Sequence, residues 1–203
     1  MVDRQLRGGG ITDTRVLAAM RKVPRDLFVP PEQQSAAYED RPLPIGFGQT
    51  ISQPYVVAFM TEALALSPSD VVLEIGTGSG YQAAVLGEIV REVYTIEIVP
   101  ELAARARGTL DAQGYRHVQV RTGDGYRGWP ERAPFPKIIV TAAPEEVPQA
   151  LIDQLSIGGT MVVPVGPRDG VQELRIITKT ERGIVTERSL PVRFVPMVKP
   201  PPA

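Results

Sequence analysis

The stretch "VVLEIGTGSGYQAAVL" (residues 71–86) decides the fold of this chain. Its first five residues are a continuous, mostly β-branched run, which is typical of a strand buried on both faces. Gly76, Gly78 and Gly80 follow, and an apolar helix pattern comes next. A buried strand that leads through glycines into a helix is the first unit of a parallel α/β sheet.

The same strand–helix alternation continues toward the C-terminus. The predicted strands are 71–75, 92–98, 117–121, 137–143 and 160–166, and the predicted helices between them are 81–90, 101–113 and 147–155. Two further strand-like runs, 172–180 and 183–198, flank a turn and predict an antiparallel edge. We therefore expect an α/β fold with a doubly wound, mostly parallel sheet.

The N-terminal third has a different pattern. We predict a helix over 12–28, bent or ended by Pro24, and another helix over 54–66. Residues 29–49 between them form a Pro- and Gly-rich connection, and a connection of that length is usually functional or disordered. The chain is expected to be a single domain, residues 1–203, with an N-terminal extension (1–66), a cofactor-binding core (67–198) and a Pro-rich tail (199–203).

Composition narrows the function. The 203 residues include 22 Lys and Arg, 23 Asp and Glu, no Cys and one His. Nothing in this charge balance calls for a nucleic acid or an anionic membrane. The lack of Cys excludes thiolate chemistry, and the single His117 excludes a multi-His metal cluster. With no long apolar segment either, we expect a cytoplasmic protein without a metal site.

The glycine spacing distinguishes between two cofactors. The dinucleotide fingerprint G-x-G-x-x-G puts its third glycine at residue 81, which is Tyr here. Glu74, two residues before the first glycine, suits a positively charged ligand better than a pyrophosphate. The sulfonium and ammonium groups of S-adenosylmethionine meet that requirement, so the motif favours this cofactor over NAD.

Two more acids follow strands at the same predicted sheet edge. Glu97 ends its strand about 20 residues after the glycines, where an acid accepts hydrogen bonds from both ribose hydroxyls. Asp124, between Gly123 and Gly125, can accept from an adenine amino group. Taken singly, Glu97 can also be a solvated strand end and Asp124 part of an Asp-Gly turn. Together with Glu74 they favour a nucleoside.

The segment "GQTISQPYVVAFM" (residues 48–60) puts polar residues immediately before an apolar helix. Ser52 stands where a helix N-cap is expected, with Pro54 in the first turn. The unpaired N–H groups of a helix N-terminus suit a carboxylate, and the Ser52 hydroxyl can donate one more hydrogen bond. The segment therefore predicts either a simple cap or a carboxylate-binding site.

Five stretches taken together resemble one known family. They are "VLEIGTGSGYQAA", "GQTISQPYVVA", "AYEDRPLPIG", "GDG" and "VRFVPMV". Over nearly its whole length the chain resembles the protein-L-isoaspartate O-methyltransferases. The resemblance implies a seven-stranded methyltransferase sheet. It also implies transfer of a methyl group from S-adenosylmethionine to the α-carboxyl of L-isoaspartyl residues, after which the ester collapses to a succinimide.

The resemblance also assigns residues. It places the active-site serine at Ser52 and a C-terminal substrate strand at residues 192–198. The expected cofactor-binding residues are Thr50, Ile51, Glu74, Gly76, Thr77, Gly78, Ser79, Gly80, Glu97, Ile98, Gly123, Asp124, Gly125 and Thr141. The expected substrate-binding residues are Ser52, Gln53, Val192, Arg193, Phe194 and Val195. Isoaspartyl proteins and peptides are the expected partners, and the enzyme is expected to be a monomer.

Two alternatives remain open at this point. A methyltransferase of the same fold can act on a small molecule or on RNA, and a non-catalytic module can bind S-adenosylmethionine without transfer. A carboxylate acceptor is already ionised at neutral pH, so it needs no general base. Tyr38, Phe47 and Tyr55 are candidates to flank a substrate peptide, although core packing is the more common role for each taken singly. We interpret His117 and Trp129 as structural.

Overall fold

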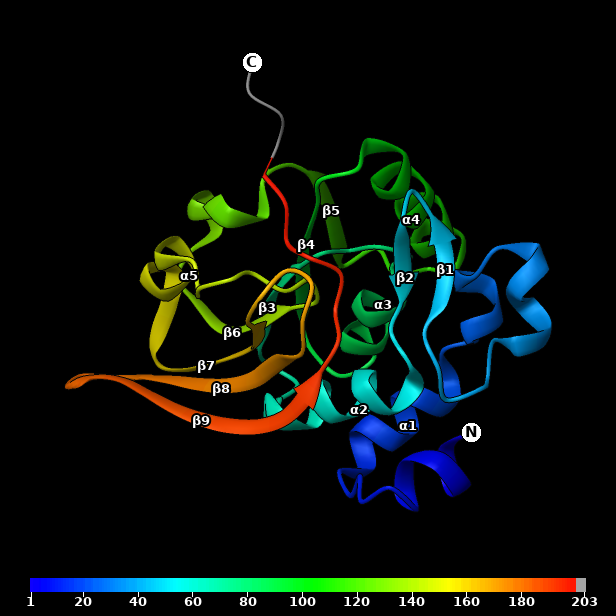
Figure 1. Ribbon diagram of the computed structural model, residues 1–203, viewed down its shortest axis with the longest axis horizontal. Helices are drawn as coiled ribbons and strands as arrows, with labels where there is room; N and C mark the ends of the chain where they lie inside the picture. The colour runs from blue at the N-terminus through cyan, green and yellow to red at the C-terminus, as the bar shows by residue number, and fades with distance from the viewer. Residues whose placement is uncertain (200–203) are drawn as a thin grey trace.

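The computed structural model describes residues 1–199, and a seven-stranded sheet with the order β5-β4-β3-β6-β7-β8-β9 runs through it (Figure 1). The strands are β3 (Val71–Ile75), β4 (Glu92–Glu97), β5 (Val118–Thr122), β6 (Phe135–Val140), β7 (Leu155–Val165), β8 (Gln172–Thr180) and β9 (Gly183–Val192). Neighbours from β5 to β7 pair in parallel, whereas β8 and β9 pair antiparallel. The predicted α/β fold with its antiparallel edge is confirmed.

The topology reverses at β3. The chain runs outward from β3 through β4 to β5 and then returns to β6 on the other side of β3. Ligands of such sheets bind outside the carboxyl ends of the strands at this switch point. The glycine loop after β3 and Thr141 after β6 meet there, and Thr141 N–H donates to Ile75 O at 2.9 Å.

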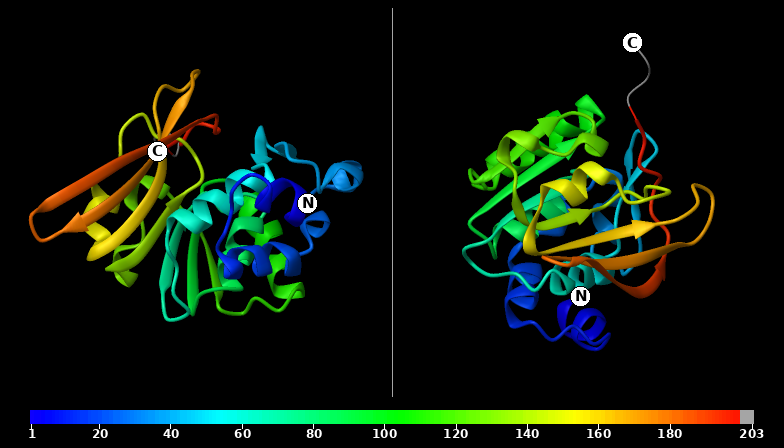
Figure 2. Two further views of the ribbon diagram at one scale, coloured as in Figure 1. Left: turned by 90° about the horizontal axis from the view of Figure 1, so that it is seen from below. Right: turned by 90° about the vertical axis from the view of Figure 1, so that its left-hand side faces the viewer.

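Helices cover both faces of the sheet (Figure 2). The connecting helices are α3 (Tyr81–Gly87), α4 (Pro100–Ala112) and α5 (Gln149–Gln154). On one face Val72 and Val93 belong to a buried cluster with residues of α3, α4 and the N-terminal helices, and on the other Leu73 and Ile96 pack with residues of α5. Alternate strand residues thus enter opposite cores, as a doubly wound sheet requires. Within residues 1–199, every helix is too short or too polar to cross a bilayer.

The N-terminal extension is more structured than the sequence predicts. It contains a π-helical segment (Val2–Arg7), α1 (Thr14–Lys22), 3₁₀ turns (Arg25–Phe28 and Pro31–Ala36), a hairpin of β1 (Leu43–Gly46) and β2 (Gln49–Ile51), and α2 (Pro54–Ala63). The predicted helix 12–28 ends at Lys22, because Val23 is extended before Pro24. The connection 29–49 is therefore ordered, and its hairpin delivers residues 49–51 to the sheet edge.

The C-terminal prediction needs a correction. The substrate strand expected over residues 192–198 stops at Val192, and only an isolated bridge between Ala143 and Pro196 follows. Residues 193–199, here called the strap, turn back from β9 across the carboxyl ends of the central strands (Figure 1). The strap is held at Ala143, whose N–H donates to Val195 O and whose carbonyl accepts from Met197 N–H, both at 2.8 Å. Apart from Lys199, the predicted Pro-rich tail lies outside the described residues.

Candidate active site

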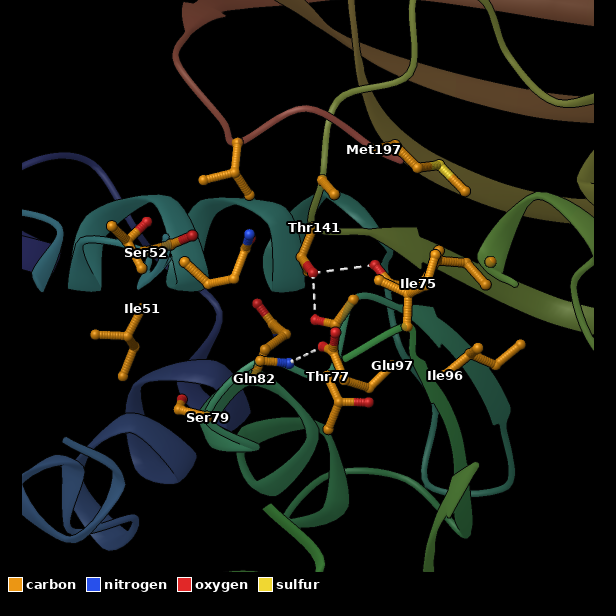
Figure 3. A pocket seen from close by; sticks show the side chains of 18 of the residues that line it. Ile51, Ser52, Ile75, Thr77, Ser79, Gln82, Ile96, Glu97, Thr141 and Met197 are labelled. Carbon is orange, nitrogen blue, oxygen red and sulfur yellow. Dashed lines mark hydrogen bonds between the residues drawn. The ribbon is translucent and has the colours of Figure 1, made fainter. Parts of the chain in front are cut away.

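A cavity, here called the inner cavity, opens at the carboxyl ends of β3, β4 and β6 (Figure 3). Its walls come from the glycine loop, the ends of β4 and β6, the β2 strand and the strap. Predicted site residues on its lining are Thr50, Ile51, Ser52, Gly76, Thr77, Gly78, Ser79, Glu97, Ile98, Gly125, Thr141 and Val195. Segments far apart in sequence therefore meet around one space at the switch point.

Glu97 connects the end of β4 to the glycine loop. Its Oε2 accepts a hydrogen bond from Gly78 N–H at 2.7 Å, and its Oε1 accepts from Val99 N–H at 3.0 Å. The side chain is 5% exposed. A carboxylate has about four acceptor sites, so two remain after these bonds.

Thr141 joins β6 to the same loop. Its Oγ1 lies 2.6 Å from Gly76 O and 3.0 Å from Ile75 O, so the single hydroxyl proton is shared between two carbonyls (Figure 3). Gly76 has φ +100°, and a Cβ there would lie 2.5 Å from Thr141 Oγ1. Glycine at this position is thus required by both backbone conformation and space.

Gln82 is a polar lining residue that the sequence motifs do not predict. It lies in the first turn of α3, and its Nε2 donates to Thr61 Oγ1 at 2.9 Å. Thr61 in turn donates to Val57 O at 2.7 Å. The available signal was a lone glutamine one residue into an otherwise apolar helix. Other unpredicted lining residues are Gln49, Val57, Met60, Ile75, Tyr81 and Ile96. Pro196, Met197 and Val198 of the segment expected to bind substrate also line this cavity.

Glu74 lies outside the lining of the inner cavity. It is fully buried, and neither carboxylate oxygen has a hydrogen-bond partner within the described residues. Burial raises the pKa of Glu74 to about 8, and the charge of Glu97 adds to this rise. The neighbouring Thr95 hydroxyl opposes the rise, but it is hydrogen-bonded to Thr77 and not to Glu74. A contact between Glu74 and a cofactor stays a prediction.

This buried acid predicts an unusual pH dependence of stability. The ordinary pKa of 4.5 applies to Glu74 in the unfolded chain, and the folded value is about 8. Between these values the folded protein binds more protons, so its free energy of unfolding falls as the pH rises. Glu74→Gln removes the titrating group, so this fall in the free energy of unfolding is absent in the variant. Relative to wild type, the variant should gain on the order of a few kcal/mol between pH 5 and pH 9, since each pKa unit is about 1.4 kcal/mol.

Denaturant unfolding at pH 5, 7 and 9 measures this difference. Glu101→Gln on the exposed side of α4 is the matched control and should leave the wild-type pH dependence intact. A Glu74→Gln protein with the pH profile of wild type would show that Glu74 is ionised at neutral pH in the folded state.

Gly80, Gly123 and Asp124 also lie outside the lining of the inner cavity. Asp124 Oδ1 accepts from Tyr126 N–H at 2.9 Å and so caps the 3₁₀ turn Gly125–Arg127. Gly125 does line the cavity, and a Cβ there would lie 2.5 Å from Ile75 Cγ2. The loop after β5 therefore borders the cavity through Gly125, and the adenine contact of Asp124 stays a prediction.

A second cavity of about 490 Å³, here called the outer groove, adjoins the first. All predicted substrate-binding residues line it, namely Ser52, Gln53, Val192, Arg193, Phe194 and Val195. Tyr55 lines it as well, whereas Tyr38 and Phe47 do not. Further lining residues are Pro42, Val56, Val171, Leu190 and Pro191. The groove is thus largely apolar, and Arg193 is the charged residue on its lining.

Four residues line both spaces: Thr50, Ser52, Thr141 and Val195. We call this set the junction. Figure 3 shows Ser52 beside the start of α2, and Thr141 between Ser52 and Ile75 in the same view. A donor in the inner cavity and an acceptor in the outer groove would meet at these four residues.

The expected capping role of Ser52 is wrong. The N-cap of α2 is Gln53, and its side chain makes no capping bond. Tyr55 N–H instead donates to Asp40 Oδ1 at 2.9 Å. Within residues 1–199 the Ser52 hydroxyl has no hydrogen-bond partner, although the residue is half-buried. The hydroxyl is therefore available to a ligand.

The two residues interpreted as structural lie away from both cavities. His117 Nε2 lies 2.9 Å from Gly87 O, and the Trp129 ring packs against Tyr94 with centroids 5.3 Å apart. Within residues 1–199 no cluster of three or more His, Cys, Asp or Glu side chains is arranged to hold a metal. Both cavities lack a histidine on their linings.

Comparisons with known proteins agree with this geometry. A sequence profile of the family described as protein-L-isoaspartate(D-aspartate) O-methyltransferase matches residues 1–201. A Gloeobacter violaceus protein-L-isoaspartate O-methyltransferase is 60% identical over 202 residues, covering 100% of this chain and 98% of the relative. A Synechococcus enzyme of the same name is 62% identical and covers 98% of this chain and 84% of its own.

Solved structures give the same result. A protein-L-isoaspartate O-methyltransferase superposes with a TM-score of 0.87 at 31% identity, covering 97% of this chain and 65% of that longer chain. A Plasmodium falciparum structure titled as this enzyme, in complex with S-adenosyl-L-homocysteine, has a TM-score of 0.86 at 26% identity and covers 98% and 97%. The resemblance found in the sequence is confirmed: the chain belongs to the protein-L-isoaspartate(D-aspartate) O-methyltransferase family.

Proposed function

We propose that this protein transfers a methyl group from S-adenosyl-L-methionine to the α-carboxyl of L-isoaspartyl residues in damaged proteins and peptides, which starts their repair through a succinimide. The observation that carries the proposal is the junction, where four residues line both the inner cavity and the outer groove. An extended peptide in the groove can bring its carboxylate to this point. Membership of the family supports the same acceptor.

The residues of the inner cavity fit S-adenosyl-L-methionine. Glu97 keeps two acceptor sites beyond its bonds to Gly78 and Val99, which suits the two ribose hydroxyls. A side chain at Gly76 or Gly125 would collide with a neighbour at 2.5 Å, so both positions leave bare backbone at the cavity. When bound, this cofactor supplies an electrophilic methyl group on a sulfonium.

The protein's own contribution is binding, orientation and exclusion of water. The Ser52 hydroxyl donates to the substrate carboxylate and holds one oxygen toward the inner cavity. The carboxylate has an ordinary pKa of about 3.9 and needs no base. In agreement, the charged residues on the two linings are Glu97 and Arg193. Glu97 is bonded to Gly78 N–H and Val99 N–H, and Arg193 is a cation, so neither is positioned to act as a base. Correct orientation of the two reacting groups contributes at most roughly 7–11 kcal/mol.

The RNA alternative finds less support. Binding of a nucleic acid relies on several cations along the contact surface. The outer groove offers Arg193 alone on an otherwise apolar or neutral lining. An apolar groove beside a free hydroxyl suits a polypeptide segment that carries one carboxylate at the junction.

Ser52→Ala tests the role of the junction. Loss of one hydrogen bond to a charged group costs about 1.5 kcal/mol, so KM for an isoaspartyl peptide should rise about tenfold. The Kd of S-adenosyl-L-homocysteine should change less than twofold, because the lost hydroxyl contacts the peptide. Ser69→Ala in the exposed turn after α2 is the matched control. A trapped methyl ether or acyl adduct on Ser52 would show that Ser52 is a covalent nucleophile and not a positioning residue.

We also propose that the enzyme works as a monomer in the cytoplasm, without metal or nucleic acid. The cysteine-free sequence and its balanced charge support the compartment and the absence of a nucleic-acid partner. Sedimentation at micromolar concentration and activity in the presence of a chelator test the oligomeric state and the metal independence.

A further inference from the structure

Asp40 lies in the loop before β1 and reaches the start of α2. Its Oδ1 accepts the Tyr55 N–H bond at 2.9 Å, although the two residues are 15 positions apart in the sequence. Asp40 lies outside the linings of both the inner cavity and the outer groove. A contact with the reacting groups is therefore not its role, and its effect on the site has to pass through α2.

The first turn of α2 explains why this bond matters. Pro54 has no N–H, so Tyr55 carries the first backbone donor of the helix. A capping side chain accepts from a donor two or three residues further on. Gln53 and Ser52 stand two and three residues before Tyr55, but the Gln53 side chain makes no capping bond. Ser52 has the short hydroxyl side chain that is typical of a cap. Asp40 and Ser52 are thus alternative acceptors for one N–H group.

The choice between them sets the direction of the Ser52 hydroxyl. A hydroxyl that caps Tyr55 N–H must turn toward the helix end, and its χ1 is then fixed in that rotamer. With Asp40 as the acceptor, the Ser52 hydroxyl has no partner within the described residues, and Ser52 lines both the inner cavity and the outer groove. We propose that Asp40 is a positioning residue, which caps α2 in place of Ser52 and so keeps the Ser52 hydroxyl free for the substrate carboxylate.

The loop that carries Asp40 is firmly held. The buried Arg25 donates from Nε to Ala37 O at 2.7 Å, and its guanidinium lies 4.9 Å from the centre of the Tyr81 ring. Gln5 Nε2 donates to the next carbonyl, Tyr38 O, at 3.1 Å. The backbone two and three residues before Asp40 is therefore fixed from two sides, as a residue that positions another must be.

A double-mutant cycle of Asp40 and Ser52 tests the inference, which rests on the proposed function. In Asp40→Ala the Ser52 hydroxyl turns to cap Tyr55 N–H, so KM for an isoaspartyl peptide rises about tenfold, as in Ser52→Ala, with little change in kcat. In the Ser52→Ala background, Asp40→Ala should leave KM unchanged. The thermal midpoint should show the reverse pattern. Its decrease in the double variant should exceed the sum of the decreases in the two single variants, because α2 then has neither cap.

Asp40→Asn retains an acceptor oxygen at the same place and should restore the wild-type KM. Asp40→Ser carries a polar side chain that is too short to reach Tyr55 N–H. If Asp40→Ala fails to fold, this variant replaces it, and the same rise in KM is expected. The matched control is Asp13→Ala, which removes the capping aspartate of α1, bonded to Arg15 N–H and Val16 N–H. It should lower the thermal midpoint without changing KM.

Three results would overturn the inference. The first is a wild-type KM in Asp40→Ala, and the second is an equal rise in KM when Asp40→Ala is made in the wild type and in Ser52→Ala. The third is a KM in Asp40→Asn as high as that in Asp40→Ala. Failure of the proposed function looks different. In that case the wild-type protein itself transfers no methyl group to the isoaspartyl peptide, although it binds S-adenosyl-L-homocysteine.

Discussion

Gly76→Ala should weaken the binding of S-adenosyl-L-homocysteine at least 100-fold, the largest loss among single substitutions in the inner cavity. The new Cβ would lie 2.5 Å from Thr141 Oγ1, and that oxygen is held by two backbone carbonyls. The φ of +100° adds strain of about 1–3 kcal/mol for an L side chain. The loop must shift to relieve both, and about 3 kcal/mol corresponds to a factor of about 100 in Kd.

Calorimetric titration of the ligand measures this effect, and Gly10→Ala provides the control. Gly10 has a nearly identical φ of +102°, but a Cβ there meets no atom within 4 Å. Its substitution carries the backbone strain without the collision and should leave Kd within twofold of wild type. Wild-type affinity in Gly76→Ala would show that the ligand does not depend on the backbone path of the glycine loop.

Glu97→Ala should have the second largest effect, a loss of about 100-fold in affinity for both S-adenosyl-L-methionine and S-adenosyl-L-homocysteine. The substitution removes the acceptor of Gly78 N–H and Val99 N–H together with the proposed ribose contacts. A hydrogen bond to a charged group contributes about 1.5 kcal/mol at the lower end of its range, so losing two costs about 3 kcal/mol, a factor of about 100 in affinity. Glu97→Gln keeps one acceptor oxygen and should lie between alanine and wild type.

Both ligands share the ribose, so both affinities should fall by the same factor. Glu92→Ala, at the opposite end of β4, is the matched control and should leave both values unchanged. An affinity that falls for one ligand only would place Glu97 near the methionine part rather than the ribose.

The local patterns of the sequence predict the sheet well. Each of the seven strands was expected at its place, and β3 and β8 have the expected bounds. Their signals are local: buried runs of β-branched residues, glycines after β3, and alternation in the antiparallel edge. The position of the inner cavity follows, because the switch point depends on strand order alone.

What could not be predicted depends on contacts between distant segments. The cap of α2 comes from Asp40 in the preceding loop, and the strap follows its path because Ala143 and Gln172 bind it, Phe194 N–H donating to Gln172 Oε1 at 2.9 Å. The contact of Glu74 with a cofactor stays a prediction, and its place outside the lining of the inner cavity has a local cause. Ile75 lines the inner cavity, and side chains alternate along a strand, so its neighbour had to point to the other face.

Methyl transfer to isoaspartyl residues is tested with labelled S-adenosyl-L-methionine and two peptides that differ only in having L-isoaspartate or L-aspartate at one position. The base-labile methyl ester formed on each peptide is counted, with wild-type protein and with Ser52→Ala. Ester is expected on the isoaspartyl peptide alone, and less of it with Ser52→Ala at subsaturating peptide. Equal transfer to both peptides, or to neither by a protein that binds the cofactor, would contradict this expectation.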